Sequence, residues 1–314
     1  MKFFIDESHD GQKLCNFLKK QSIPFSMINK LLRTKQIKIN DSIISSNINL
    51  KNGDKIEILA KLEIEKKPNL EKDLDELYEK FKSMIIFENK DLIAINKPDH
   101  LAVQLGTKVK FCVETLMNAY TMKLSELNKS SGSENYPKVQ KLRIVHRIDK
   151  DTSGILLIAK TIDSARKLTK AFEDKLIHKT YFAILSFTDK QAYNSIQSFG
   201  TIVNKLKKQT ISGEELVVVS NSGDEAITDY EVVKKLNHRY ILIKFMPLTG
   251  RTHQLRVHSK TLGGYILGDQ KYALQKDNEK HLHLNASQVV INKKVFGHEI
   301  TIDIPLPDFF KNKL

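Results

Sequence analysis

Cysteines and long apolar stretches are scarce in this sequence, and each scarcity excludes a class of protein. Only two cysteines, Cys15 and Cys112, occur in 314 residues. Two thiols cannot build a disulfide framework or a four-thiolate zinc site, which favours a reducing compartment. No apolar run approaches the roughly 20 residues that cross a bilayer. The N-terminus, MKFFIDESHD, lacks the apolar core of a signal peptide. We therefore expect a cytoplasmic protein with no membrane partner.

The bulk composition is that of a folded, basic protein. Hydrophobic residues make up 40% of the chain and charged residues 28%, which argues against disorder. The length suits one large domain, or a large domain and a small one. The formal net charge is +14, with 51 basic against 37 acidic residues. This excess favours an anionic partner, nucleic acid before membrane, although a generally lysine-rich surface would produce the same charge.

Arginine is rare, and its placement is informative. Seven of the 51 basic residues are arginines, and four of these seven fall in two short motifs. Arg143 and Arg147 belong to LRIVHRIDKDTSG, and Arg251 and Arg256 belong to TGRTHQLRVH. A guanidinium group is preferred over an ammonium group where a planar fork must hold a carboxylate or phosphate. The two motifs are therefore candidate functional segments.

The first sixty residues predict a small α/β module. Apolar spacing predicts helices over 11–20 and 26–33, and alternating isoleucines predict short strands near 37–39 and 56–58. Basic residues line the polar side of this region, and they are Lys30, Arg33, Lys35 and Lys38. Such faces are usually only solvated, but this one is a candidate RNA-binding edge. A charged stretch with little apolar periodicity follows and predicts a linker over 63–80 that runs into a short helix.

The remainder, 81–314, predicts a larger domain of mixed α+β class. A hairpin is expected over 84–98, and helices over 111–127 and 161–176. Strands are expected at 142–146, 155–159, 180–185, 216–219, 227–233 and 240–245, and the segment around Arg256 also resembles a strand. We expect a large, mainly antiparallel sheet.

The motif HRIDKDTSG concentrates polar groups between two apolar segments. It brings a histidine, an arginine, two aspartates, a threonine and a serine into nine residues, 146–154. Polar groups at such density are costly unless each has a partner or a task. Turn formation explains part of the composition, and from the motif alone it is as good an explanation as catalysis. The buried strand ILLIAK that follows would hold such a loop rigidly.

Three motifs in order carry a family resemblance. They are HRIDKDTSGILLIAK at 146–160, HKTYFAIL at 178–185 and LTGRTHQLRVH at 248–258, accompanied by NKP at 96–98 and GDQKY at 268–272. Together they resemble the RluA-type family of RNA pseudouridine synthases. The first sixty residues resemble the S4 RNA-binding domain. Within the family the C and D types that modify large-subunit ribosomal RNA are most similar, and SMINKLLR and SGEELVVVS favour the C type.

The resemblance implies an architecture and a reaction. It implies an S4-like RNA-binding domain over 1–62, a linker over 63–80 and a catalytic domain over 81–314. The enzyme would isomerise uridines of 23S ribosomal RNA by breaking the N-glycosidic bond and rejoining the base through C5, without a cofactor. We expect a monomer. A non-catalytic RNA-binding factor in ribosome assembly is the alternative function.

The resemblance also assigns roles to individual residues. Asp149 matches the catalytic aspartate, whereas Asp151 is better explained as a turn residue. Tyr181 matches the tyrosine that stacks on the base and is a candidate proton acceptor, although a phenol with a pKa of about 10 is a poor base unless its surroundings lower that value. Arg256 matches the arginine that pairs with the catalytic aspartate. Arg147 matches the residue that fills the space left by the flipped base.

Metal binding and departures from the family pattern complete the expectations. His146, His253 and His258 could be metal ligands, but we expect them to make hydrogen bonds within the motifs, and we expect no metal. A metal hydrolase would lose its activity on chelation, which distinguishes that hypothesis.

The family usually carries Gly and His after NKP and Gly after GDQKY, whereas this chain has His100, Gln104 and Ala273. These departures bear on substrate contacts more than on catalysis.

Overall fold

The structure is a computed structural model, and it describes residues 1–21, 23, 25–60, 73–105, 111–130, 141–211, 213–273 and 278–314. The chain forms two compact units. One contains Met1–Leu74 and Gln104–Thr115, and the other contains Asp75–Val103 and Leu116–Leu314. Outside the described residues lie 63–72, which form most of the predicted linker, and residues 131–140. No helix in the described ranges is long and apolar enough to cross a membrane.

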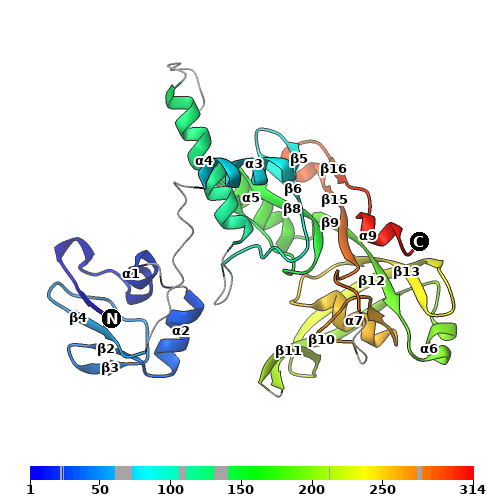
Figure 1. The fold of residues 1–314 in the computed structure, drawn as a ribbon, viewed down its shortest axis with the longest axis horizontal. Coiled ribbons are helices and arrows are strands. Elements are labelled where there is room, and N and C mark those ends of the chain that lie inside the picture. The colour runs from blue at the N-terminus through cyan, green and yellow to red at the C-terminus, as the bar shows by residue number, and fades with distance from the viewer. Residues whose placement is uncertain are drawn as a thin grey trace. The chain divides into compact units, whose positions relative to one another are not determined.

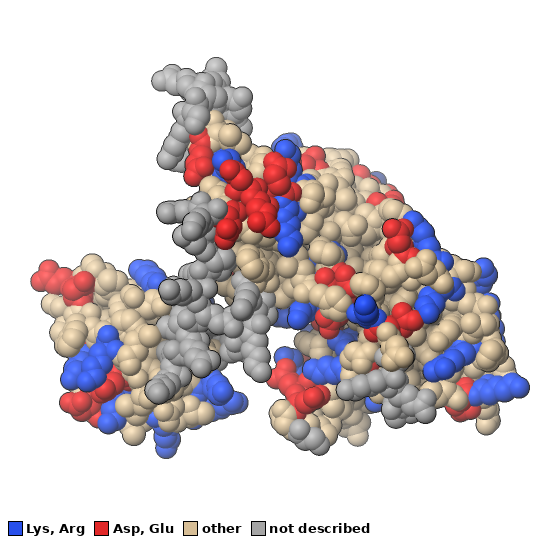
Figure 2. Space-filling model, in the orientation of Figure 1, with Lys and Arg blue, Asp and Glu red and all other residues tan. Residues whose placement is uncertain are grey.

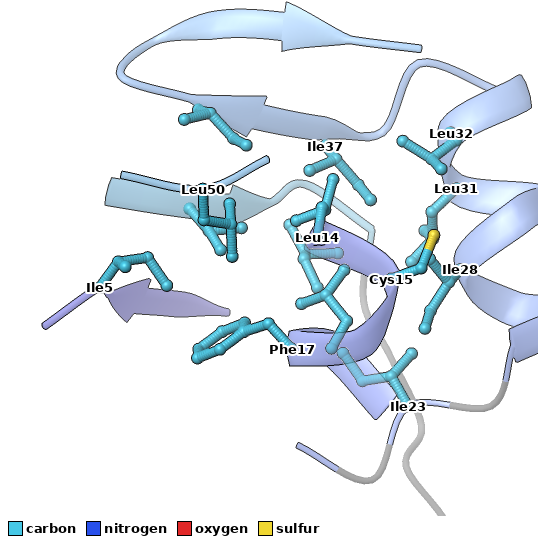
Figure 3. Close-up of a cluster of buried hydrophobic side chains, with 14 residues drawn as sticks. Ile5, Leu14, Cys15, Phe17, Ile23, Ile28, Leu31, Leu32, Ile37 and Leu50 are labelled. Carbon is cyan, nitrogen blue, oxygen red and sulfur yellow. The ribbon is translucent and has the colours of Figure 1, made fainter. Parts of the chain in front are cut away.

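The N-terminal unit is a small sheet covered by two helices (Figure 1). Its sheet has the strand order β1-β4-β2-β3. The elements are β1 Lys2–Phe4, the 3-10 helix η1 Glu7–His9, α1 Leu14–Lys20, α2 Phe25–Arg33, β2 Ile37–Ile39, β3 Ser42–Ile44 and β4 Lys55–Ile58. Figure 3 shows the core, in which Leu14 of α1 lies beside Ile37 of β2 and Cys15 of α1 lies beside Ile28 of α2. The two predicted helices and the predicted strands of this unit are confirmed.

In the described ranges, the larger unit is built on a sheet of 12 strands. The main path runs β11-β10-β12-β13-β9-β15-β8-β6-β5, and β14, β16 and β7 pair at its sides. The strands are β5 Ile85–Glu88, β6 Leu92–Lys97, β7 Arg143–Ile144, β8 Ser153–Ala159, β9 Ile177–Ser186, β10 Phe199–Ile211, β11 Glu214–Val219, β12 Asp224–Lys235, β13 Tyr240–Pro247, β14 Tyr265–Ile266, β15 Leu284–Ile291 and β16 Ile300–Asp303. Among the described strands, β8 and β15 pair in parallel and the other pairs are antiparallel. The mixed, mainly antiparallel sheet is therefore confirmed.

Several helices of different lengths lie around this sheet. They are α3 Leu74–Met84, α4 Val113–Ser130, α5 Ile162–Glu173, α6 Lys190–Ser195, α7 Gln254–Thr261, α8 Lys293–Phe296 and α9 Asp308–Lys311. Helix α5 begins with a capping box between Thr161 and Ser164, and it packs its buried Leu168 and Ala171 against β8 (Figure 1). Every residue of β8 is buried, which explains its uninterrupted apolar sequence. The buried strand β8 therefore holds in place the loop that precedes it in the sequence.

Candidate active site

The HRIDKDTSG motif forms the loop between β7 and β8, as predicted. Asp149 lies in this loop with 23% of its side chain exposed. The loop ends at Gly154, whose φ of +112° and close approach to β15 exclude a side chain, because a Cβ there would lie 2.3 Å from the backbone oxygen of Ala286. The glycine therefore lets β8 pair with β15 directly behind Asp149.

A buried lysine holds the same loop from the other side. Lys97, the lysine of NKP at the end of β6, is completely buried, and its Nζ donates hydrogen bonds to the carbonyl oxygens of Pro98, Leu101 and Lys150 at 2.8, 2.8 and 3.0 Å. Burial lowers the pKa of Lys97 to about 7, against the opposing charges of Asp99, Asp151 and Asp149. Lys97 thus ties the end of β6 to the residue that follows Asp149.

A cavity of about 350 Å³ opens beside Asp149. Its walls come from the β7–β8 loop, from β9 and from the start of α7. Among the residues that line it are Asp149, Arg147, Tyr181 and Arg256. The volume is within the usual range for a small-ligand pocket. The structure therefore brings the four residues predicted for this domain to one cavity.

Tyr181 stands on β9 in this cavity and is 8% exposed. Its pKa is raised well above the ordinary value, first by burial and second by the negative charge of Asp149. The environment thus moves the phenol away from the lowered pKa that a proton acceptor would need. At neutral pH Tyr181 is a neutral ring with a hydroxyl group, suited to stacking more than to accepting a proton.

Arg256 lies on helix α7 and not on a strand, so the prediction for this segment is wrong. Residues 254–259 are all buried, which removes the amphipathic period by which a helix is recognised. The Gln254 side chain anchors the first turn, because its Oε1 accepts from the backbone N–H of Arg251 at 3.0 Å and its Nε2 donates to Thr228 Oγ1 at 2.8 Å. Helix α7 is therefore an internal helix that presents its residues to the cavity from within the core.

Arg256 makes its ion pair with Asp269 and not with Asp149. Its Nε and Nη2 donate to the Asp269 carboxylate at 2.8 and 2.6 Å, and the two side chains are 5% and 1% exposed. Asp269 also accepts from the backbone N–H groups of Lys271 and Tyr272, both at 3.0 Å. The predicted direct pairing of Arg256 with Asp149 is therefore wrong, because the guanidinium group of Arg256 pairs with Asp269 of GDQKY. The negative charge of Asp149 still acts on Arg256 through space.

His253 is the side chain that meets Asp149, a role that its motif did not indicate. Its Nε2 lies 3.9 Å from Asp149 Oδ2, and its Nδ1 lies 2.7 Å from the Tyr272 hydroxyl, which accepts from the backbone N–H of Val217 at 2.9 Å. When Tyr272 donates to Nδ1, the neutral ring carries its proton on Nε2 and directs it toward Asp149. Burial lowers the pKa of His253, against the opposing charge of Asp149. Its φ of +53° as the N-cap of α7 is a further mark of a constrained position.

The remaining predicted residues differ in their surroundings. Arg147 lines the cavity, is exposed, and makes no hydrogen bond or ion pair with the part of the chain that the structure describes. The four basic residues of the predicted RNA-binding edge lie on α2, in the turn after it and on β2, and they are Lys30, Arg33, Lys35 and Lys38. Lys38 is half-buried and the other three are exposed. On the face shown in Figure 2, basic side chains are spread over both units and do not form one patch.

His146 and His258 make hydrogen bonds inside the protein, which agrees with the structural role expected for them. His146 Nε2 accepts from the backbone N–H of Leu157 at 2.8 Å, and His258 Nδ1 lies 2.9 Å from Thr228 Oγ1. Burial lowers the pKa of His146 to about 3, with a smaller effect of the positive charge of Lys179, and burial lowers that of His258 to about 4.

These two histidines predict acid sensitivity of the fold. In the unfolded chain an imidazole titrates at about 6.5, so between that pH and about 4 the unfolded state binds protons that the folded state does not. The free energy of unfolding is therefore fully retained above about pH 6.5 and falls as the pH drops, by up to about 1.4 kcal/mol per pH unit for each group. Urea unfolding at pH 7.5 and pH 5 measures this loss. The slope of the free energy of unfolding against pH gives the number of protons taken up on unfolding. Replacing His258 with Asn is expected to reduce this slope by the equivalent of one proton. An unchanged slope would contradict the lowered pKa of His258.

Comparison with known proteins agrees with this geometry. The pattern that defines the RNA pseudouridylate synthase family matches residues 91–261. A ribosomal large subunit pseudouridine synthase C of Rickettsia felis is 35% identical over 296 residues, covering 91% of this chain and 90% of that protein. The protein of the same name from Rickettsia bellii is 36% identical over 299 residues, covering 90% of each. The solved structure of human RNA pseudouridylate synthase domain containing 4 matches with a TM-score of 0.60 and 24% identity, covering 78% of this chain and 97% of that one.

The chain belongs to the RNA pseudouridylate synthase family. It is an RNA pseudouridine synthase, an isomerase, and the expected RluA-type resemblance is confirmed. Apart from Leu284, the residues that line the cavity beside Asp149 lie within the stretch that the family pattern matches. Of the departures from the family pattern, His100 has a left-handed backbone with a φ of +59°, the conformation that glycine adopts freely. This residue lies outside the cavity lining.

Proposed function

We propose that this synthase converts uridines of 23S ribosomal RNA to pseudouridine, with Asp149 as its catalytic residue. The support that carries the proposal is the convergence on one cavity of Asp149, Tyr181, Arg147 and Arg256 from three separate motifs. The relatives named above act, by their names, on the large ribosomal subunit. Cys15 and Cys112 are both free thiols, in keeping with a cytoplasmic, reducing location.

The reaction needs few groups from the protein. The bond from uracil N1 to the ribose C1′ breaks, the base turns, a bond forms from C5 to C1′, N1 gains a proton and C5 loses one. The carboxylate of Asp149 acts at the sugar, either by adding to C1′ or by removing a proton from the ribose. Tyr181 provides a neutral ring against the base. Arg147, free of partners among the described residues, is available to occupy the space that the flipped base leaves.

The surrounding residues act by positioning. The ion pair of Arg256 with Asp269 fixes helix α7 beside the cavity, and Lys97 fixes the loop that carries Asp149. His253 Nε2 lies 3.9 Å from Asp149 Oδ2, beyond hydrogen-bond distance, so His253 acts on the carboxylate through its electrostatic field. A reactive group must be held closely in place for such catalysis, and these contacts provide that preorganisation.

Conversion of purified ribosomal RNA tests the proposal. Unmodified large-subunit and small-subunit ribosomal RNA carrying tritium at uracil C5 are incubated with the enzyme, and release of tritium to water reports loss of the C5 hydrogen. We expect release from the large-subunit RNA and little from the small-subunit RNA. Release from neither RNA, with the enzyme folded, would leave the non-catalytic assembly factor as the better account. Preference for the small-subunit RNA would overturn the substrate.

We also propose that residues 1–62 are an S4-like RNA-binding domain, separated by a linker over 63–80 from a catalytic domain over 81–314. The two helices and small sheet of the N-terminal unit, with basic residues on α2 and β2, support this assignment. The domain would add affinity through phosphate contacts with little choice of sequence.

A salt titration measures the contribution of that basic edge. Replacing all four of its residues, Lys30, Arg33, Lys35 and Lys38, with Gln is expected to weaken RNA binding at low salt. Removing one cation that neutralises a phosphate flattens the slope of log affinity against log salt concentration by roughly 0.7–0.9, so the four together flatten it by up to about 3. Replacing Lys167 and Lys170 of α5, which already pair with Asp163 and Asp174, is the control and should leave the slope unchanged. An equal effect of both sets would contradict the assignment.

A further inference from the structure

A cluster of histidine and aspartate side chains lies outside the cavity that contains Asp149. Asp99 and His100 follow β6, and His281 precedes β15. Ligand atoms of these three side chains all lie within 4.8 Å of one another. The reaction proposed for this enzyme does not use them. Because imidazole nitrogen and carboxylate oxygen are the donors that zinc-class ions prefer, the cluster has the composition of a transition-metal site.

The distances inside the cluster are close to those of a metal site. His100 Nε2 lies 3.3 Å from Asp99 Oδ2, and His281 Nδ1 lies 2.5 Å from the same oxygen. In a tetrahedral zinc site with bonds of about 2.0–2.1 Å, the donor atoms are roughly 3.3 Å apart. The first pair already has this separation, and the second would need to open by only about 0.8 Å. An ion therefore fits among the three donors with small movements of side chains.

A second carboxylate orients the His100 ring. Asp151 Oδ1 lies 3.2 Å from His100 Nδ1, on the opposite side of the ring from Asp99. A metal-binding histidine commonly donates its other N–H to a carboxylate in this way, which fixes the ring and its tautomer. In the metal-free protein, Nε2 donates to the carbonyl oxygen of Lys280 at 3.0 Å, so an incoming metal ion displaces a proton from Nε2 when it binds there. The His281 ring is oriented as well, by stacking on Phe309 at a centroid distance of 4.7 Å.

Two further features fit a ligand at this place. His100 has a φ of +59°, a strained conformation for a residue other than glycine, and such strain persists where the surroundings enforce it. The side chains of His100 and His281 are 54% and 42% exposed, so solvent reaches both rings. His100 also lines a cavity of about 550 Å³, whose lining includes Asp151, Lys280 and, from the neighbourhood of the active site, His253 and Arg256. The carbonyl oxygen of Lys280, 3.0 Å from His100 Nε2, or a water molecule can complete the coordination.

We propose that Asp99, His100 and His281 bind a divalent transition-metal ion of the zinc class, with Asp151 holding His100 in place. The two histidines exclude magnesium and calcium as the preferred ions, because these take oxygen ligands. The ion would join the segment after β6 to the segment before β15. Through Asp151, two residues beyond Asp149, it would also join both to the catalytic loop. The site takes no part in the chemistry and does not depend on the RNA substrate proposed above.

Metal titration of the full-length, chelator-treated protein tests this site. Cobalt(II) is added and its visible absorption recorded, and zinc(II) binding is measured by calorimetry and by competition with cobalt. We expect one ion per chain, with the intense visible bands of a four- or five-coordinate cobalt centre, which zinc removes. His100→Gly is expected to abolish these bands. Glycine accepts a φ of +59° without strain, so this variant should fold at least as well as the wild type.

Further variants and a melting measurement fix the interpretation. His281→Gln should also abolish the bands, and Asp151→Asn should weaken binding by about 10–100-fold, the usual effect of removing an outer partner of a ligand. His298→Gln, which removes an exposed histidine elsewhere in the same unit, is the control and should bind as the wild type does. Zinc should raise the melting temperature of the wild type but not that of His100→Gly. The proposal is overturned if the wild type binds no cobalt even at millimolar concentration, or if His100→Gly binds it equally well.

Discussion

Asp149→Asn is expected to lower the rate of pseudouridine formation by about 10⁴-fold or more while leaving RNA binding nearly intact. The amide has the size and shape of the carboxylate but can neither add to C1′ nor accept a proton from the ribose. Loss of a nucleophile or base in comparable enzymes costs about 10⁴–10⁶ in rate. The tritium-release assay measures turnover, and a filter-binding assay on the same RNA measures affinity.

A matched substitution makes this result specific. Asp163→Asn makes the same chemical change on the exposed surface of α5, where Asp163 pairs with Lys167. It should leave turnover within about twofold of the wild type, since an exposed surface ion pair contributes little to stability and nothing to the cavity. Comparable turnover by Asp149→Asn and by the wild type would show that the carboxylate is not the reacting group.

Asp269→Asn is expected to destabilise the fold by about 3–5 kcal/mol, the usual cost of removing one partner of a buried ion pair. The guanidinium of Arg256 would remain at 5% exposure without its counter-charge. The amide oxygen of Asn can still accept from the backbone N–H groups of Lys271 and Tyr272, so the loss isolates the ion pair. Urea unfolding at neutral pH measures the change in the free energy of unfolding.

A second substitution separates charge burial from loss of packing. In the double variant Asp269→Asn with Arg256→Met, the unpaired charge is removed while an extended side chain stays in the core. It should recover a large part of the stability that Asp269→Asn alone loses, because apolar replacements of buried ion pairs are often close to neutral. It should not recover turnover, since the cavity loses the Arg256 guanidinium. A double variant less stable than either single variant would contradict the account of the pair.

Much of the larger sheet could be predicted from the sequence because its strands are apolar runs or alternations bounded by turns. The run ILLIA forms the C-terminal part of β8, and the alternation near 227–233 lies within β12. The loop between β7 and β8 could be predicted from its polar density. These are local signals, and they depend on the period and composition of a few neighbouring residues.

Helix α7 could not be predicted in the same way. Leu255 and Val257 flank Arg256 as alternate residues of a strand would, and both are buried. The helix is buried on all sides over 254–259, so no polar face marks its period. The usual signal of a helix start is also missing, because the N-cap is His253, whose side chain makes no capping hydrogen bond.

The partners of the site residues were the least predictable feature. Arg256 meets Asp269 and not Asp149, and His253 meets Asp149, because side-chain contacts between distant segments follow from tertiary packing. A buried arginine requires a carboxylate, and Asp269 of GDQKY was the acidic residue available in a second motif. The cluster of Asp99, His100 and His281 joins residues about 180 positions apart, and no short motif encodes such a meeting.

The central claim, that this synthase modifies large-subunit ribosomal RNA through Asp149, is tested most directly by mapping pseudouridines in ribosomal RNA from cells. Three strains are compared, in which the gene is deleted, restored as wild type or restored as Asp149→Asn. We predict that specific pseudouridines in the large-subunit RNA disappear on deletion, return with the wild type and stay absent with Asp149→Asn. An unchanged set of pseudouridines in the deletion strain, or their return with Asp149→Asn, would contradict the account.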